Sequence, residues 1–141
     1  MSLQILQPEG WVKPRGYANG VLAEGKLLFT GGQVGWDPTS DVPRFPADFG
    51  AQFDLALSNV CAVLRAGGAE PSHLVRCTVY VTDKREYLAA LKDVGAAWKR
   101  HVGRHYPAMA LVQVAGLLED AAKVEIEATA VIPHDVVPRS P

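Results

Sequence analysis

The clearest strand signal in the chain is LVRCTVYVT, residues 74–82, in which apolar and polar side chains alternate. The apolar residues are Val75, Cys77, Val79 and Val81. The polar residues between and after them are Arg76, Thr78, Tyr80 and Thr82. Because successive side chains of a strand point to opposite faces, this alternation predicts a strand whose apolar face packs on helices.

A helical pattern precedes this strand. Its apolar residues recur at spacings of three and four, which places them on one stripe of a helix. They are Phe49, Phe53, Leu57, Val60, Cys61 and Leu64. We expect the helix to begin near Pro46, because proline is tolerated in a first helical turn, and to end at Gly67 and Gly68.

A second helical pattern follows the strand. Asp83 and Glu86 fit the capping residue and the third position of a helix start. The apolar stripe of this helix consists of Leu91, Val94, Trp98 and Val102. The helix is expected to end near Gly103, because glycine is a common residue just beyond a helix.

Four further strands complete the pattern. Residues 17–23 and 26–30 are expected to form an opening hairpin around Glu24 and Gly25. Residues 108–115 are apolar on nearly both faces, and residues 123–132 form the last strand. The predicted order is β-β-α-β-α-β-β, an α+β fold with two helices on one face of a mixed sheet.

Two helices cover only one face of such a sheet. The other face would carry Tyr80, Leu111 and similar residues. Since large apolar patches on monomers are rare, a second copy of the chain is the simplest cover, and the sequence therefore predicts an oligomer.

Length and composition limit the remaining possibilities. The chain has 141 residues, which suits one domain, expected over residues 1–132 with a flexible tail at 133–141. Its net charge of −1 argues against an electrostatic grip on nucleic acid or on a membrane surface. No apolar run approaches the roughly 20 residues of a membrane span, and no signal peptide is visible, so we expect a cytoplasmic location. Cys61 and Cys77 are accordingly expected to be reduced, buried thiols.

Three motifs resemble those of a known family. Residues 30–34, Thr-Gly-Gly-Gln-Val, are similar to its Thr-Ser-Gly-Gln-Ile/Val strand end. Residues 106–110, Tyr-Pro-Ala-Met-Ala, are similar to its Pro-Ala-Arg-Ser, and residues 123–128, Lys-Val-Glu-Ile-Glu-Ala, to its Val-Glu-Ile-Glu-Ala. With Gly16-Tyr17, these motifs resemble the Rid family (also called YjgF) of enamine and imine deaminases, over residues 16–132.

The resemblance implies a chorismate-mutase-like fold. It also implies a homotrimer in which three sheets form a central β-barrel, with ligand clefts between neighbouring subunits. We expect a small-molecule substrate or ligand and no cofactor. A metal site is also not expected: His101 and His105 are four residues apart, but the helix is ending there and no third ligand is spaced nearby.

The same resemblance assigns the catalytic role to Glu125. In deaminating members the corresponding glutamate is proposed to place or activate the water that hydrolyses an imine to a 2-oxo acid and ammonia. Glu127 shares the strand face of Glu125, because strand side chains alternate. The alternative interpretation is that both glutamates are solvated charges or ion-pair partners.

Met109 stands where the family has the arginine that holds the substrate carboxylate. Methionine has no charge and no donors, so it cannot make that contact, whose loss costs on the order of 2–5 kcal/mol of binding. The alternative is that Met109 only fills space in a strand. Arg104 and Arg76 are the candidates for replacing the missing charge.

Further departures indicate a more apolar site. Gly31 stands where many members have serine, and Leu91 where deaminating relatives often have asparagine. The expected substrate-binding residues are Tyr17, Gly31, Gly32, Leu91, Met109 and Leu111. Each has an ordinary structural alternative, such as core packing for the leucines and an interface role for Tyr17.

These residues support two hypotheses and a weaker third. The first is a Rid-like hydrolase that acts on reactive enamines, imines or related metabolites, with ordinary 2-imino acids disfavoured by Met109. The second is a non-catalytic trimer that binds a small molecule on the same fold. RNA cleavage or translation inhibition is the least favoured, because the net charge is only −1.

Overall fold

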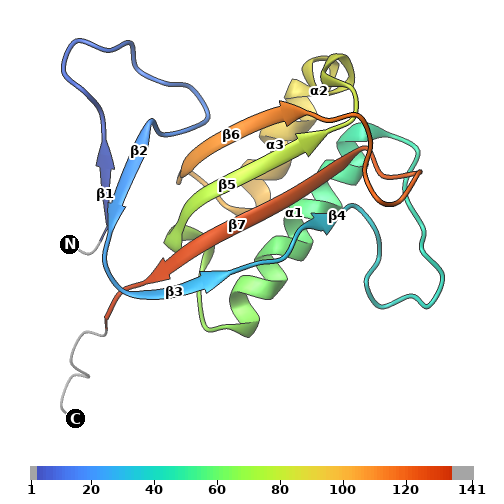
Figure 1. Ribbon diagram of the computed structural model, residues 1–141, viewed down its shortest axis with the longest axis horizontal. Coiled ribbons are helices and arrows are strands. Elements are labelled where there is room, and N and C mark those ends of the chain that lie inside the picture. Colours follow the sequence, from blue (N-terminus) through green and yellow to red (C-terminus); the bar gives the residue numbers. More distant parts are fainter. Residues whose placement is uncertain (1–2, 135–141) are drawn as a thin grey trace.

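The structure is a computed structural model and describes residues 3–134. The expected tail therefore lies almost entirely outside the described residues. Figure 1 shows the elements in chain order: β1 Leu3–Leu6, β2 Gly20–Ala23, β3 Lys26–Phe29, β4 Gln33–Val34, α1 Phe49–Ala66, a 3₁₀ turn Pro71–His73, β5 Leu74–Val81, α2 Lys84–Ala89, α3 Leu91–His101, β6 Ala108–Gln113 and β7 Val124–Ile132. The predicted order is confirmed, with β1 and β4 as additions and with the second helix divided in two.

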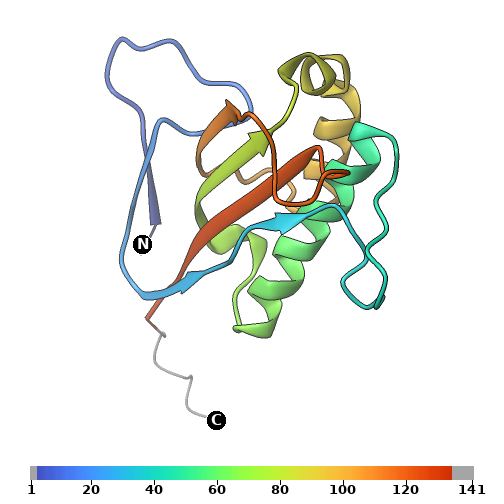
Figure 2. The same cartoon turned by 45° about the vertical axis from the view of Figure 1, so that its right-hand side comes forward.

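The main sheet has the order β3-β7-β5-β6, and β4 also pairs with β7. Strand β6 runs parallel to β5, and the other pairs are antiparallel. Helices α1 and α3 lie on one face of this sheet, and no helix among residues 3–134 lies on the opposite face, which we call the uncovered face (Figure 2). The predicted α+β class with its main helices on one face is confirmed.

Strand β5 is the middle of the sheet. Cys77, Val79 and Val81 are buried in the core beneath the helices, as the alternation predicts. An irregularity between Leu74 and Arg76 shifts the register with β7. Leu74, rather than the predicted Val75, is therefore fully buried at the start of the strand.

Strand β6 corrects a second expectation. Met109 is paired in register with Cys77, and Leu111 with Val79. Because paired residues of neighbouring strands point to the same face, Met109 and Leu111 face the helices and pack against the core. The prediction that Leu111 lies on the uncovered face was wrong, since the alternation within one strand does not say which face is which.

The prediction of an opening hairpin from residues 17–23 and 26–30 is also wrong. Strand β2 pairs with β1, with Leu3 opposite Ala23, whereas β3 joins β7 in the main sheet. Gly25 makes this change of partner possible: its φ is +154°, and a Cβ atom there would overlap the carbonyl of Ile132. The β1–β2 ribbon consequently projects beside the main sheet (Figure 1).

Helix α1 begins later than expected. Asp48, not Pro46, is the capping residue, and its carboxylate accepts a hydrogen bond of 3.0 Å from the Ala51 amide. The helix ends as predicted, with Gly67 at its end and Gly68 at a φ of +83°. The carbonyl of Pro46 instead accepts from the buried side chain of Gln52.

The second helical segment breaks at Ala90, which separates α2 from α3. Asp83 caps α2, as predicted, by accepting from the Arg85 amide at 2.9 Å. Glu86 does not complete the cap, because its carboxylate accepts from Lys123 Nζ at 2.6 Å. None of the described helices has the length and apolar character of a membrane span.

Candidate functional site

A cavity of about 530 Å³ opens on the helix side of β6, between this edge strand, α3 and the segment before β2. Its lining is aromatic, aliphatic or glycine at every position but one. The lining residues are Arg15, Gly16, Tyr17, Phe53, Val79, Tyr87, Leu91, Val94, Gly95, Trp98, Tyr106, Met109 and Leu111. The structure thus brings together four of the predicted binding residues, Tyr17, Leu91, Met109 and Leu111.

Backbone contacts hold Tyr17 at the mouth of this cavity. The Ala18 amide donates to the Pro107 carbonyl at 2.9 Å, and Ala18 forms a parallel bridge with Ala108. The segment before β2 is therefore attached to the beginning of β6. Tyr17 remains 42% exposed and Leu91 49% exposed, so both line an open mouth and neither is a core residue in the single chain.

Two stacked aromatic rings form one wall. The rings of Trp98 and Tyr106 are 6.0 Å apart between centroids and within 9° of parallel. Trp98 is held by its indole N–H, which donates to the His105 carbonyl at 2.9 Å. Burial raises the pKa of Tyr87, another lining residue, so its hydroxyl stays neutral at ordinary pH. The wall is therefore aromatic and uncharged.

Arg15 is the one charged residue of the lining, and sequence reasoning missed it. Neither of the arginines considered from the sequence lines the cavity. Arg76 lies on β5 between the core-facing positions and so faces the uncovered side, and Arg104 lines a separate hollow with His105. The available signal was the position of Arg15, directly before the Gly16-Tyr17 motif.

The remaining predicted residues lie on the uncovered face of the sheet. Glu125 pairs with Tyr80 of β5 and with Val34 of β4. Its carboxylate lies over Gly32, where a Cβ atom would overlap Oε2. Gly31 is exposed, and a Cβ atom there would meet nothing within 4 Å. Gly32 thus leaves the space that Glu125 occupies, whereas a side chain at Gly31 would not meet Glu125.

Glu127 has a different environment from Glu125, although both project from the same face of β7. Tyr80 Oη donates to Glu127 Oε1 at 3.1 Å, and this hydrogen bond is the main cause that raises the pKa of Tyr80. The carboxylate of Glu125 accepts no hydrogen bond from any residue between 3 and 134. Of the two glutamates, Glu125 is therefore the one whose two carboxylate oxygens both lack a donor among the described residues.

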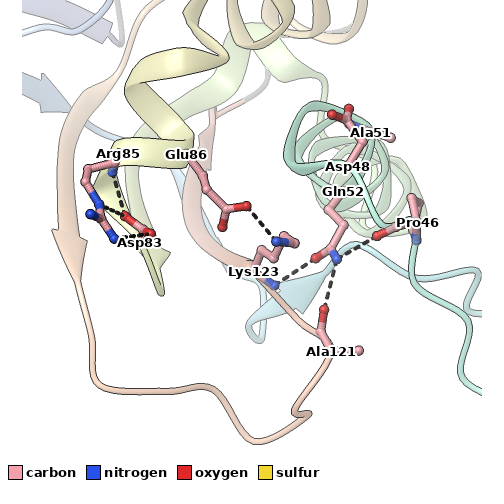
Figure 3. Close-up of polar contacts among 9 residues, drawn as sticks. All are labelled: Pro46, Asp48, Ala51, Gln52, Asp83, Arg85, Glu86, Ala121 and Lys123. Atoms are coloured by element: carbon pink, nitrogen blue, oxygen red, sulfur yellow. Dashed lines mark hydrogen bonds and ion pairs between the residues drawn. The ribbon is translucent and has the colours of Figure 1, made fainter.

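A buried side chain fixes the start of β7, the strand that carries Glu125. Gln52 donates to the carbonyls of Pro46 and Ala121, at 2.8 and 2.9 Å, and accepts from the Lys123 amide at 2.8 Å (Figure 3). The ion pair between Lys123 and Glu86 adds a second attachment to α2. These contacts connect two loops to α1 and position the strand whose second residue is Glu125.

The predicted site is thus divided within one chain. Met109, with Tyr17, Leu91 and Leu111, belongs to the cavity on the helix side. Glu125, with Gly31 and Gly32, belongs to the uncovered side of the same sheet. The predicted site residues therefore lie on two different surfaces of one chain, which the sheet separates.

The two histidines do not form a metal pair. His101 Nε2 lies 2.8 Å from Asp54 Oδ1, and His105 Nε2 lies 2.6 Å from the Leu74 carbonyl. Within residues 3–134, no group of three His, Cys, Asp or Glu side chains could hold a metal ion.

Comparisons with known proteins agree with this architecture. The family model described as Endoribonuclease L-PSP matches residues 12–132. Protein DfrA of Myxococcus xanthus is 38% identical over 107 residues, which cover 76% of this chain and 77% of that protein. The 2-iminobutanoate/2-iminopropanoate deaminase of Escherichia coli is 36% identical over 107 residues, covering 76% of this chain and 80% of that protein.

Solved structures give the same result. The Rid-family protein YyfB from Yersinia pestis has a TM-score of 0.81 at 29% identity, covering 94% of this chain and 100% of that one. E. coli TdcF with bound serine has a TM-score of 0.68 at 32% identity, covering 92% and 98%. By sequence, by motif order and by fold, the chain belongs to the Rid family, also known as the YjgF family.

Proposed function

We propose that this protein hydrolyses reactive imines or enamines, with Glu125 as the group that activates water. The observation that carries the proposal is the half-buried Glu125, whose carboxylate lies over Gly32 and accepts no hydrogen bond from any of the described residues. A relative 36% identical to the chain is named a 2-iminobutanoate/2-iminopropanoate deaminase, which supports this class of reaction.

The chemistry requires little beyond a placed base. Water attacks the carbon of the C=N bond while Glu125 accepts a proton from it, and the nitrogen is protonated. The resulting carbinolamine loses ammonia as its C–N bond breaks, and the carbonyl product remains. One water is consumed for each imine hydrolysed, and no oxidant, reductant or cofactor is needed.

We further propose that the complete site forms between copies in a homotrimer. In that assembly the uncovered face with Glu125 would lie next to the cavity of a neighbouring copy, which contains Met109. The exposed apolar side chains on the uncovered face, such as Phe29 at 68% exposure, support an interface there. Small 2-imino acids would be poor substrates, since Met109 gives their carboxylate no charged partner.

The test is ammonia release from freshly generated imines, with acidic and neutral analogues compared. Glu125→Gln keeps the size of the side chain but removes the base, and should lower turnover by about a hundredfold or more. Glu127→Gln is the matched control, because Glu127 lies on the same strand face but is bonded to Tyr80. If no imine is turned over, or if both variants behave alike, the proposal fails.

A second candidate is a binding protein without catalysis. It is favoured by one observation, the methionine at position 109 in a largely apolar cavity. A small molecule that raises the unfolding temperature but is not consumed would support this candidate over the enzyme.

A further inference from the structure

The chemistry of the cavity is more specific than its apolar lining suggests. Arg15 is its single charged residue, and it makes no ion pair with any acidic side chain in the described part of the chain. A lone cation at the edge of an apolar cavity provides both parts of a recognition site for an apolar anion. Guanidinium suits a carboxylate in particular, because its donors match both oxygens.

Gly95 is a second, independent feature. It lies within α3 and lines the cavity. Glycine destabilises a helix interior relative to alanine, and a Cβ atom at this position would meet nothing within 4 Å. Packing within the chain therefore does not require the glycine, and the effect of its missing side chain is to keep the cavity open along α3.

The third feature is the flat wall. The nearly parallel rings of Trp98 and Tyr106 present aromatic surface on which another ring can stack. A cavity of about 530 Å³ is within the range that holds ring-bearing small molecules. Short acids such as propionate would leave most of this apolar surface in water.

We propose that the cavity binds a ring-bearing monocarboxylate whose carboxylate is held by Arg15 and whose ring occupies the space beside Gly95. This inference rests on the proposed function in that it names the substrate class of the same site: imines of acids with bulky apolar side chains. In this assignment the cation that holds the carboxylate, Arg15, comes from the segment before β2. Residue 109 on β6 supplies no charge, because it is methionine.

Direct binding to the full chain tests the proposal without any turnover. Calorimetry would compare phenylacetate and indole-3-acetate with their uncharged amides and with propionate. The ring acids should bind about tenfold more tightly than their amides, because the contact to Arg15 is charged but partly exposed. Propionate should not bind measurably.

Arg15→Gln should remove the difference between acid and amide while the affinity for the amide is unchanged. Arg44→Gln is the matched control, since Arg44 is an exposed arginine of the loop before α1 and does not line the cavity. Equal affinity of acid and amide in the unchanged protein would overturn the proposal. The proposal would also be overturned if Arg104→Gln lost the difference in affinity between acid and amide while Arg15→Gln kept it.

Gly95→Leu places a side chain at a position that lines the cavity, where a Cβ atom would meet nothing within 4 Å in the described part of the chain. It should abolish binding of both acid and amide while the circular dichroism spectrum and the unfolding temperature are maintained. Retained binding in this variant would show that the ligand lies elsewhere. If the ring acids bind through Arg15 but the protein hydrolyses no imine, only the proposed deaminase function is refuted. Turnover of imines with no binding of the ring acids would refute only this inference.

Discussion

The carboxylate of Glu125 lies over the Cα atom of Gly32, in the space that any side chain at position 32 would occupy. The two residues are far apart in sequence, and the pairing of β4 with β7 brings them together. A glutamate with free oxygens on an exposed sheet face, beside a glycine that makes room for it, is the structural basis of the proposed reaction.

Gly32→Ala should therefore displace Glu125 and lower kcat by about a hundredfold, which is the contribution of a positioned base. The unfolding temperature should change little, because the overlapping atoms belong to the end of a flexible side chain. Imine turnover and thermal unfolding would be measured on the same preparations. A variant with unchanged kcat would show that the position of Glu125 over Gly32 is irrelevant to catalysis.

Met109→Arg should improve the hydrolysis of small 2-imino acids. An arginine at this position would supply the charged contact that methionine lacks, with at least about a tenfold gain in kcat/KM for imines of short amino acids. Met109→Leu, which keeps the position apolar, is the control and should give no gain. Equal activity of the two variants would mean that the cavity has diverged beyond one contact.

Phe29→Glu tests the assembly. Phe29 lies on the uncovered face of β3 and is 68% exposed in the single chain. A carboxylate there should prevent burial of this face, so light scattering should detect a folded monomer in place of a trimer. Imine turnover should fall with it, because in the proposed trimer the two halves of the site come from different copies. A trimer that survives this substitution would place the interface elsewhere.

Gln52→Leu should lower the free energy of unfolding by about 2–4 kcal/mol, because it removes partners from three backbone groups. These groups are the carbonyls of Pro46 and Ala121 and the amide of Lys123. Urea unfolding would give the value. Gln113→Leu is the comparison, since Gln113 is exposed and serves a single amide, and a similar loss in both variants would contradict the role assigned to Gln52.

Cys77 predicts how stability depends on alkaline pH. Burial raises the pKa of its thiol from 9.0 to about 12. Since the folded-state pKa is the higher one, this stabilisation is complete below pH 9.0 and is lost as the pH rises from 9.0 towards 12. The contribution decreases by at most about 1.4 kcal/mol per pH unit.

Cys77→Ala should therefore flatten the decrease in unfolding free energy above pH 9, although it lowers stability at neutral pH by leaving a cavity. Urea unfolding at several pH values between 8 and 10.5 would compare the two proteins. Burial also raises the pKa of Cys61 and of Tyr87, and both proteins contain these two residues. Their effects therefore cancel when the two unfolding free energies are subtracted, and the difference reports on Cys77. Parallel curves for the two proteins would contradict the assignment to Cys77.

Much of the fold was readable from local patterns. The stripe from Phe49 to Leu64 and the alternation from Cys77 to Val81 are properties of single elements, and both are confirmed. The opening hairpin failed because strand partners are chosen over long range: β2 pairs with β1 and β3 with β7. Nothing local to Glu24 and Gly25 distinguishes a hairpin turn from a change of sheet.

The sequence by itself determined the family, the order of the main elements, the pairing of Glu125 and Glu127 on one face, and the absence of a charged anchor at Met109. The tertiary structure alone decided which face each strand presents: the register of β6 with β5 turns Met109 and Leu111 towards the helices. It also decided that Arg15 borders the cavity. The physical reason is that alternation along a strand specifies two sides, whereas only packing against neighbouring elements says which side is covered and which distant residue lies beside it.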